Sequence, residues 1–165
     1  MQHICTYQSP IGEILLVADD EYLTGLWFVG SKGCPQNLKI STEQILPVIT
    51  QTIQWLDEYF QGKIPYFPPQ LKMRGTKFQM DVWAILLEIP YGQTVTYGSI
   101  AQQLATKYGK AKMSAQAVGQ AVGRNPISLI VPCHRVVGAN TNLVGYGAGV
   151  DKKIYLLNLE NIKIN

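Results

Sequence analysis

Residues 124–138 read RNPISLIVPCHRVVG, and the one cysteine of this stretch stands between a proline and a histidine. The apolar run from Ile127 to Val131 predicts a strand that ends at Pro132. A thiol beside an imidazole indicates an activated sulfur, because the thiolate and not the thiol is the nucleophile. A lone cysteine after an apolar strand is, however, more often a small buried core residue. Cys133 and His134 by themselves leave both interpretations open.

Two short helices joined by a polar turn are predicted before this stretch. Thr96 can cap the first, which runs through Leu104, and residues 107–112 form the turn. The second runs from Ser114 to about Val122 and is rich in Ala and Gly. The pattern is typical of a helix-turn-helix, in which small side chains let the backbone approach another surface. Tight packing inside the fold would explain the same composition.

The first part of the chain predicts a sheet and a helix. Three apolar runs within residues 4–29 alternate with turns, which favours an antiparallel meander. A helix is expected over residues 42–60, with Thr42 as its cap and one apolar stripe. The prolines between residues 65 and 69 then mark an extended connector.

The fold class follows from this order of elements. We expect an α/β protein with a small N-terminal antiparallel-sheet-plus-helix lobe over residues 1–70. A mainly helical, winged-helix-like lobe with the helix-turn-helix follows over residues 75–165. Its last helix is expected over residues 151–160, with Asp151 as the cap.

Composition narrows the function classes. The chain has 165 residues, 47% of them hydrophobic and 15% charged, and a net charge of +3, which fits a folded protein that tolerates but does not demand nucleic acid. Three widely spaced cysteines and two histidines give poor support to a zinc site or a disulfide framework. No apolar stretch has membrane-spanning length. We expect a cytoplasmic protein without metal or organic cofactor.

The residues around Cys133 resemble those of a known repair family. Asn125-Pro126, then Val131 to Val136, then Gly145-Tyr146 with its glycine-rich loop, are similar to the alkylguanine-DNA alkyltransferases, also called methylated-DNA–protein-cysteine methyltransferases. The likeness is strongest from Gly75 to Glu160. It implies DNA repair by direct reversal, in which an alkyl group passes from O6 of guanine to the protein's own cysteine, once per molecule. The implied partner is double-stranded DNA with an alkylated guanine, and the implied state is a monomer.

The resemblance also implies roles for five catalytic residues. Cys133 would be the nucleophile and alkyl acceptor, and His134 would take its proton through a water. Glu160 would orient His134; from the sequence alone it could equally be a solvated residue at the end of the chain. Asn125 would be a hinge and join the hydrogen-bond network around the thiol, although Asn before Pro is often only a turn residue. Tyr97 would give a proton to the departing guanine, unless it is merely a packed aromatic.

The implied base pocket comes from the segments around the cysteine. Tyr146 would stack on the guanine, and the backbone N–H of Gly147 would donate to its O6 atom. Val122 would line the pocket. The carbonyls of Cys133 and Val136 would accept from the exocyclic amine. Arg135 has a structural or phosphate role that the sequence leaves open.

The implied DNA-binding surface is the second short helix, which enters the minor groove in the similar proteins. Its face would contain small residues and one departure from the family pattern, a glutamine in place of the usual arginine: Ser114, Ala115, Gln116, Ala117 and Gly119. A glutamine can wedge into a base stack but lacks the cationic and stacking properties of a guanidinium. We therefore expect weaker and more passive capture of the flipped base.

Two other functions are compatible with parts of the pattern. A cysteine hydrolase could use Cys133, His134 and Glu160, but it would need an oxyanion hole, and a helix-turn-helix is an odd accessory for it. A non-catalytic binder of damaged bases would not need the cysteine, which this chain retains.

Overall fold

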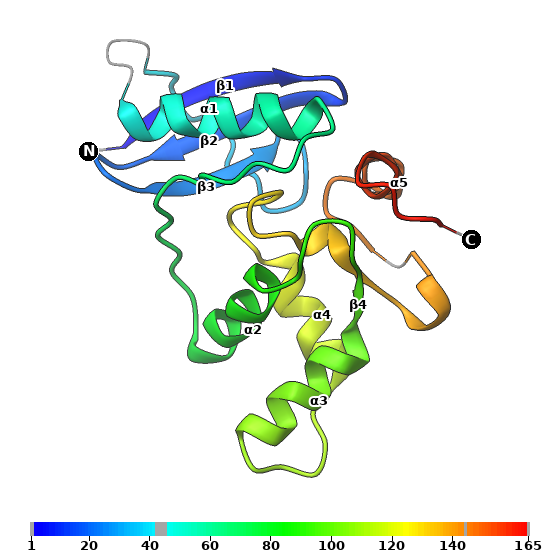
Figure 1. Cartoon of the computed structure of the whole chain (residues 1–165). Coiled ribbons are helices and arrows are strands. Elements are labelled where there is room, and N and C mark those ends of the chain that lie inside the picture. The colour runs from blue at the N-terminus through cyan, green and yellow to red at the C-terminus, as the bar shows by residue number, and fades with distance from the viewer. Residues whose placement is uncertain (1, 42–45, 144, 165) are drawn as a thin grey trace. The chain divides into compact units, whose positions relative to one another are not determined.

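The computed structural model describes residues 2–41, 46–143 and 145–164. The chain divides into two units (Figure 1). Unit 1 consists of Met1–Met73 together with Pro126–Ile130, and unit 2 consists of Arg74–Asn125 and Val131–Asn165. The chain therefore leaves unit 2 after Asn125 and returns to it at Val131.

Unit 1 is built on a three-stranded antiparallel sheet with the order β1 (His3–Ser9), β2 (Gly12–Ala18) and β3 (Leu23–Phe28). The predicted meander is confirmed. The central strand β2 is buried from residue 14 to residue 18, as expected of a strand with both faces covered. Helix α1 (Pro47–Phe60) contacts β2 and β3.

Helix α1 begins later than the sequence pattern predicts. Its first residue is Pro47, and Leu46 is at the N-cap without a side-chain capping bond. Proline suits the first helical position because its missing N–H would have no partner there and its fixed φ is already helical. The predicted cap, Thr42, lies outside the described residues.

The strand predicted over Ile127–Val131 is wrong. Ile127 makes only an isolated bridge to Leu26, whose N–H donates to the Pro126 carbonyl and whose carbonyl accepts from Ser128. Leu129 then has a φ of 71°, a conformation uncommon outside glycine, which ends any extended pairing. Its side chain is fully buried, so apolar packing holds the strained turn in place.

Unit 2 contains the predicted helix-turn-helix. Helices α2 (Lys77–Leu87), α3 (Tyr97–Lys107) and α4 (Ala115–Gly123) contact one another. The predicted cap of α3 is confirmed, because Thr96 Oγ1 accepts from the N–H of Ser99 at 3.0 Å. Ser114 caps α4 in the same way, by accepting from Ala117 at 3.1 Å. Together the units have the α/β architecture expected from the sequence.

Two further features fix the helices of unit 2. The Trp83 side chain of α2 is buried, and its Nε1–H donates to the Ala121 carbonyl of α4 at 2.9 Å. Strand β4 (Val95–Thr96) pairs in parallel with β5 (Val136–Val137). This pairing brings the start of α3 beside the residues that follow the cysteine.

The last helix, α5 (Val150–Leu159), has Gly149 at its N-cap rather than the predicted Asp151. Gly149 has a φ of 107°, which a residue with a side chain rarely adopts. Asp151 is in the first turn, where its negative charge complements the helix dipole. The sequence was right to place an acidic residue at the start of this helix, but Asp151 lies two positions after the N-cap and not at it.

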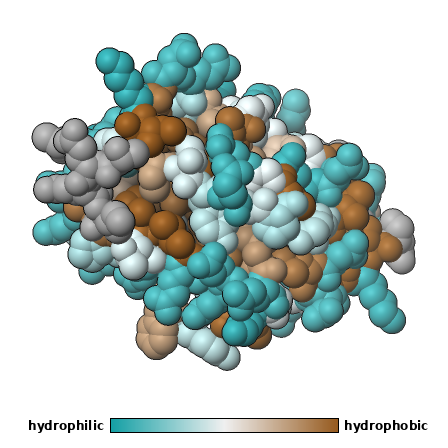
Figure 2. All heavy atoms as spheres, turned by 90° about the horizontal axis from the view of Figure 1, so that it is seen from above, coloured by the Kyte–Doolittle hydropathy of each residue, from teal (hydrophilic) through white to brown (hydrophobic). Residues whose placement is uncertain are grey.

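None of the helices among the described residues is long and apolar enough to cross a membrane. On the face seen in Figure 2, hydrophobic residues form separate areas with hydrophilic residues between them. Single exposed apolar side chains of this kind are normal on folded proteins.

Candidate active site

The cysteine lies in a tight turn of unit 2. Residues Cys133–Arg135 form one turn of 3₁₀ helix that leads directly into β5. The N–H of Cys133 donates to the Val131 carbonyl at 2.8 Å, and Pro132 occupies the position before the turn. Cys133 is 8% exposed, so the residue is largely buried without being sealed from solvent. The turn places the thiol and the next side chain, His134, at the start of the same buried segment.

His134 is held by a carboxylate at the end of α5. Its Nε2 lies 2.5 Å from Oε2 of Glu160, and neither side chain is exposed. Burial lowers the pKa of His134, although the hydrogen bond and charge of Glu160 oppose this shift. The imidazole is therefore neutral at neutral pH. Because an ionised carboxylate only accepts hydrogen bonds, Nε2 carries the proton and Nδ1 carries the lone pair of a base.

Glu160 also has hydrogen-bond partners other than His134. Its Oε1 accepts from Nε of Arg135 at 2.8 Å and from the N–H of Gly92 at 3.0 Å. Burial alone would raise the pKa of this carboxyl, but the hydrogen bonds from His134, Arg135 and Gly92 lower it to about 2. Glu160 is thus ionised throughout the physiological range and is not a solvated terminal residue.

Arg135, whose role the sequence left open, is part of this network. Its Nη1 donates to the Ile89 carbonyl at 2.8 Å, and its guanidinium carbon lies 5.6 Å from the centre of the Tyr91 ring. The side chain is buried, with Glu160 as its counter-charge. Arg135 therefore connects the loop after α2 to the end of α5.

Asn125 connects α4 to the cysteine turn. Its Nδ2 donates to the Val131 carbonyl at 2.8 Å, and its backbone N–H donates to the Val122 carbonyl at 3.2 Å. The Val131 carbonyl thus accepts from both Asn125 and Cys133. Asn125 closes the excursion that the chain makes into unit 1.

Two tyrosines lie close enough to Cys133 for its charge to affect them. Burial raises the pKa of Tyr97, the first residue of α3, and the negative charge of Cys133 raises it further. Burial also raises the pKa of Tyr146 well above its usual value, and the negative charge of Cys133 raises it further. Both phenols are therefore protonated at neutral pH and can act as donors.

Lys153 is a buried cation beside the site that our sequence analysis did not identify. Its Nζ donates to the Val136 carbonyl at 2.6 Å and lies 5.9 Å from the centre of the Tyr97 ring. Burial lowers the pKa of Lys153 to about 8, although the negative charge of Cys133 opposes the shift. The Val136 carbonyl, expected to accept from the guanine amine, has one of its two lone pairs engaged by this lysine.

The expected DNA-binding residues are the N-cap and the first residues of α4. Ser114, Ala115 and Gln116 are exposed, and Ala117 and Gly119 are half-buried. Val118 and the expected pocket residue Val122 are buried. Gly147 lies in an exposed turn before α5.

Within the described residues, no group of three or more His, Cys, Asp and Glu side chains is arranged to hold a metal ion.

Two family descriptions match most of the chain. The ribonuclease-like domain of 6-O-methylguanine DNA methyltransferase matches residues 3–67, and the DNA-binding domain of the same protein matches residues 77–162. The chain belongs to the methylated-DNA–protein-cysteine methyltransferase family.

Relatives of this family are similar over nearly the whole length. A methylated-DNA–protein-cysteine methyltransferase of Mycobacterium leprae is 41% identical over 164 residues, which is 99% of this chain and 95% of the relative. One of Methanosarcina acetivorans is 43% identical over 93% of this chain and 95% of its own length. The crystal structure of Mycobacterium tuberculosis OGT in complex with DNA matches with a TM-score of 0.83 at 40% identity, covering 96% of this chain and 92% of that chain.

For this methyltransferase, a sequence signal for Lys153 did exist. Lys153, Leu156, Leu157 and Glu160 have the spacing of one helix face, and all four are buried. Ile154, the next residue along the chain from Lys153, is only half-buried. A lysine on the apolar face of a short helix could have been taken as a buried cation near the thiol.

Proposed function

We propose that this protein repairs double-stranded DNA by moving an alkyl group from O6 of guanine to Cys133. The observation that carries the proposal is the series Cys133, His134 and Glu160, in which a buried carboxylate fixes the proton of the neutral imidazole next to the thiol. In a member of this family, that arrangement fits an alkyl-accepting cysteine.

The reaction proposed is a displacement at the alkyl carbon. Nδ1 of His134 takes the thiol proton through a water, and the proton then returns to solvent. The thiolate forms an S–C bond as the C–O bond to guanine breaks, and the electron pair of that bond stays with the base. Tyr97, which its raised pKa keeps protonated, gives the departing guanine a proton and then regains one from solvent.

The product is a thioether, which offers water no carbonyl to attack. The protein therefore reacts once and stays alkylated. The nucleophile is part of the chain and the substrate already carries its leaving group, so the step requires no cofactor. The odd number of widely spaced cysteines supports a reducing compartment, and we propose the cytoplasm.

We propose that a monomer binds the duplex through the minor groove. The exposed face of α4 offers small residues, which suit a narrow groove, and Gln116 would occupy the gap left by the flipped base. Tyr146 would stack on the guanine, Gly147 would donate its N–H to O6, and Val122 would line the pocket. Asn125 would link α4 to the reacting thiol.

Intact mass spectrometry tests the proposal directly. After incubation with a duplex containing O6-methylguanine, each molecule should gain the mass of one CH₂ group, located by peptide mapping on Cys133. The Cys133→Ala variant should gain none and still bind the duplex. Binding without transfer by the unaltered protein would favour a lesion binder, and repeated turnover on an amide would favour a cysteine hydrolase.

A further inference from the structure

The net charge of +3 is unevenly distributed between the two units. Unit 2 contains ten Lys and Arg residues and four Asp and Glu residues, whereas unit 1 contains four and seven. The net charges are therefore +6 for unit 2 and −3 for unit 1. No acidic residue occurs between Glu88 and Asp151, a stretch that includes the whole helix-turn-helix after α2. Unit 2 is the part of the chain whose charge suits a polyanion.

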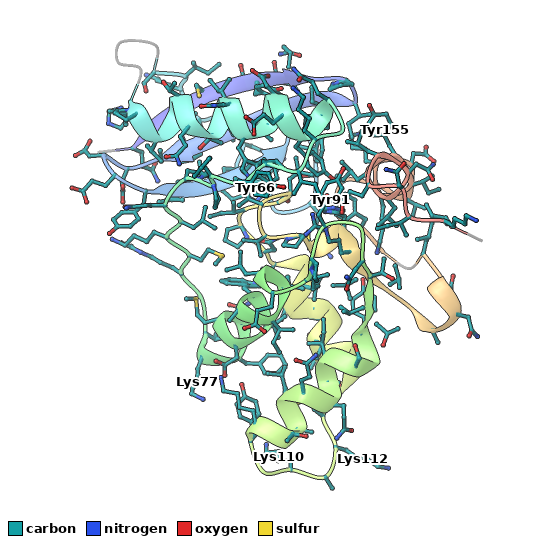
Figure 3. The ribbon with its side chains drawn as sticks, in the orientation of Figure 1. Tyr66, Lys77, Tyr91, Lys110, Lys112 and Tyr155 are labelled. Atoms are coloured by element: carbon teal, nitrogen blue, oxygen red, sulfur yellow. The ribbon has the colours of Figure 1, made fainter. Side chains whose placement is uncertain are left out.

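Four lysines of unit 2 surround the end of α3. Lys77 is at the start of α2 and Lys107 is the last residue of α3, while Lys110 and Lys112 lie in the turn that leads to α4. Figure 3 shows Lys77, Lys110 and Lys112 at the same end of unit 2. The Lys77 ammonium lies 4.9 Å from the centre of the Tyr108 ring, which joins the start of α2 to the end of α3. We call these four residues the lysine edge.

Only one carboxylate partly neutralises the lysine edge within the described residues. Asp81 lies 3.1 Å from Nζ of Lys107 and 3.6 Å from Nζ of Lys77, and it also accepts from the Tyr108 hydroxyl. Lys110 and Lys112 are exposed and form no ion pair with any residue that the structure describes. Two cations thus project from the turn without a protein counter-charge.

The helix next to this turn lacks charge altogether. Helix α4 reads AQAVGQAVG, and its cap, Ser114, comes two residues after Lys112. A helix without a cationic side chain makes no charged contact with phosphate. Gln116 occupies the position at which the family pattern would supply an arginine. The attraction for a polyanion must therefore come from the residues beside α4.

We propose that the lysine edge binds the phosphate backbone of the DNA strand next to the groove that α4 enters, with Lys110 and Lys112 as its outermost contacts. This inference rests on the proposed function, since it assumes that α4 faces duplex DNA. Backbone contacts of this kind position a protein on DNA without reading sequence or damage. The lysine edge therefore holds any duplex, damaged or intact, and leaves recognition of the lesion to the pocket around Cys133.

The test is the salt dependence of binding to an undamaged duplex. Each phosphate contact contributes a slope of about 0.9 to the fall of log K with log salt. The double variant Lys110→Gln/Lys112→Gln should therefore have a slope shallower by about 2. The matched control is Lys32→Gln/Lys39→Gln, which removes two exposed lysines of unit 1 and should leave the slope unchanged.

A second readout separates attraction from chemistry. In the Lys110→Gln/Lys112→Gln variant, the half-saturating DNA concentration for methyl transfer should rise, and the rate at saturating DNA should keep its original value. Affinities for damaged and undamaged duplexes should fall by the same factor. An unchanged salt slope, or an equal loss in the control pair, overturns the inference. Failure of the proposed function would instead appear as an unaltered protein that binds DNA but never gains a methyl group.

Discussion

Glu160 is the residue on which the site's electrostatics depend. It accepts hydrogen bonds from His134, Arg135 and Gly92, which belong to two separate segments of unit 2. A carboxylate in such a setting performs two tasks, because it orients the base and balances a buried guanidinium. The two tasks predict two different losses when its charge is removed.

Glu160→Gln should reduce both stability and activity. The amide leaves Arg135 buried without a counter-charge, so the free energy of unfolding should fall by about 3–5 kcal/mol. Methyl transfer should slow by about 10²-fold, because the imidazole loses the acceptor that fixes its tautomer. Urea unfolding and single-turnover transfer measure the two effects. Glu88→Gln, at an exposed position, is the control. If Glu160→Gln lost no more stability and activity than Glu88→Gln, the role assigned to Glu160 would be wrong.

Acid should reveal the same carboxylate. The folded pKa of about 2 is below the ordinary value of 4.5, so the stabilisation is complete above about pH 4.5 and is lost as pH falls from there toward 2. The lowered pKa of Glu160 contributes about 3 kcal/mol to the free energy of unfolding. The unfolding free energy of the unaltered protein should therefore fall more steeply between about pH 5 and about pH 3 than that of Glu160→Gln. Parallel pH profiles of the two proteins would show that the neighbours of Glu160 do not lower its pKa.

Tyr146→Phe should separate the ring of this residue from its hydroxyl. The ring that would stack on guanine is retained, but the buried hydroxyl near Cys133 is removed. A thiolate that forms beside it then has no phenol donor to stabilise its charge, so less thiolate is present at neutral pH. We expect methyl transfer at neutral pH to slow by about tenfold, the size of effect that one hydrogen bond to a charged group has. The rate should recover as pH rises. Tyr155→Phe on α5 is the control, and a loss independent of pH would refute the explanation.

At the scale of elements, the helix-turn-helix depends on contacts that a sequence pattern does not display. Helix α4 is short and has no charged pairs, so little beyond its buried face holds it against α2. The hydrogen bond from Trp83 to the Ala121 carbonyl adds a directional contact between these two helices.

Trp83→Phe should loosen α4. The substitution removes the hydrogen bond to the Ala121 carbonyl, which still accepts from the N–H of Arg124 at 3.2 Å. The free energy of unfolding should therefore fall by about 0.5–1.5 kcal/mol, in addition to the effect of the lost ring area. Trp27→Phe, a half-buried position in unit 1, reports the effect of ring area alone. Hydrogen exchange of the α4 amides should accelerate in Trp83→Phe and not in Trp27→Phe. Equal protection of the α4 amides in both variants would show that the Trp83 hydrogen bond does not stabilise this helix.

Local signals explain why some elements were predictable. Thr96 and Ser114 cap their helices through bonds within three residues, so the boundaries of α3 and α4 follow from the sequence. The segment after Pro126 has the apolar composition of a strand, but its conformation is decided by pairing with Leu26, about a hundred residues earlier in the chain. The role of Arg135 stayed open, and Lys153 was not identified, for the same reason, since their partners are distant in sequence.

At the scale of the whole molecule, the sequence predicted two lobes separated near residues 70–75. The structure assigns Pro126–Ile130 to unit 1, although these residues come from within the second predicted lobe. The side chains of Ile127, Leu129 and Ile130 are buried, and the backbone of this segment is hydrogen-bonded to Leu26 of β3.

A fragment of residues 1–73 should therefore be less stable than unit 1 in the full chain. It lacks two backbone hydrogen bonds to Leu26 and three buried apolar side chains, each worth about 1.5–3 kcal/mol when fully buried. We expect it to unfold at lower urea concentration or without cooperativity, as followed by circular dichroism. A fragment as stable as unit 1 in the full chain would show that the segment is dispensable.

The excursion of the chain at residues 126–130 also limits how members of this family can be recombined. A chimera that exchanges unit 1 for that of a relative cannot be made by a single crossover, because the chain passes between the units after residues 73, 125 and 130. The short donor insert has to be spliced between Asn125 and Val131, the two residues whose hydrogen bond closes the excursion. Gene shuffling should therefore favour inheritance of this pentapeptide with the amino-terminal half.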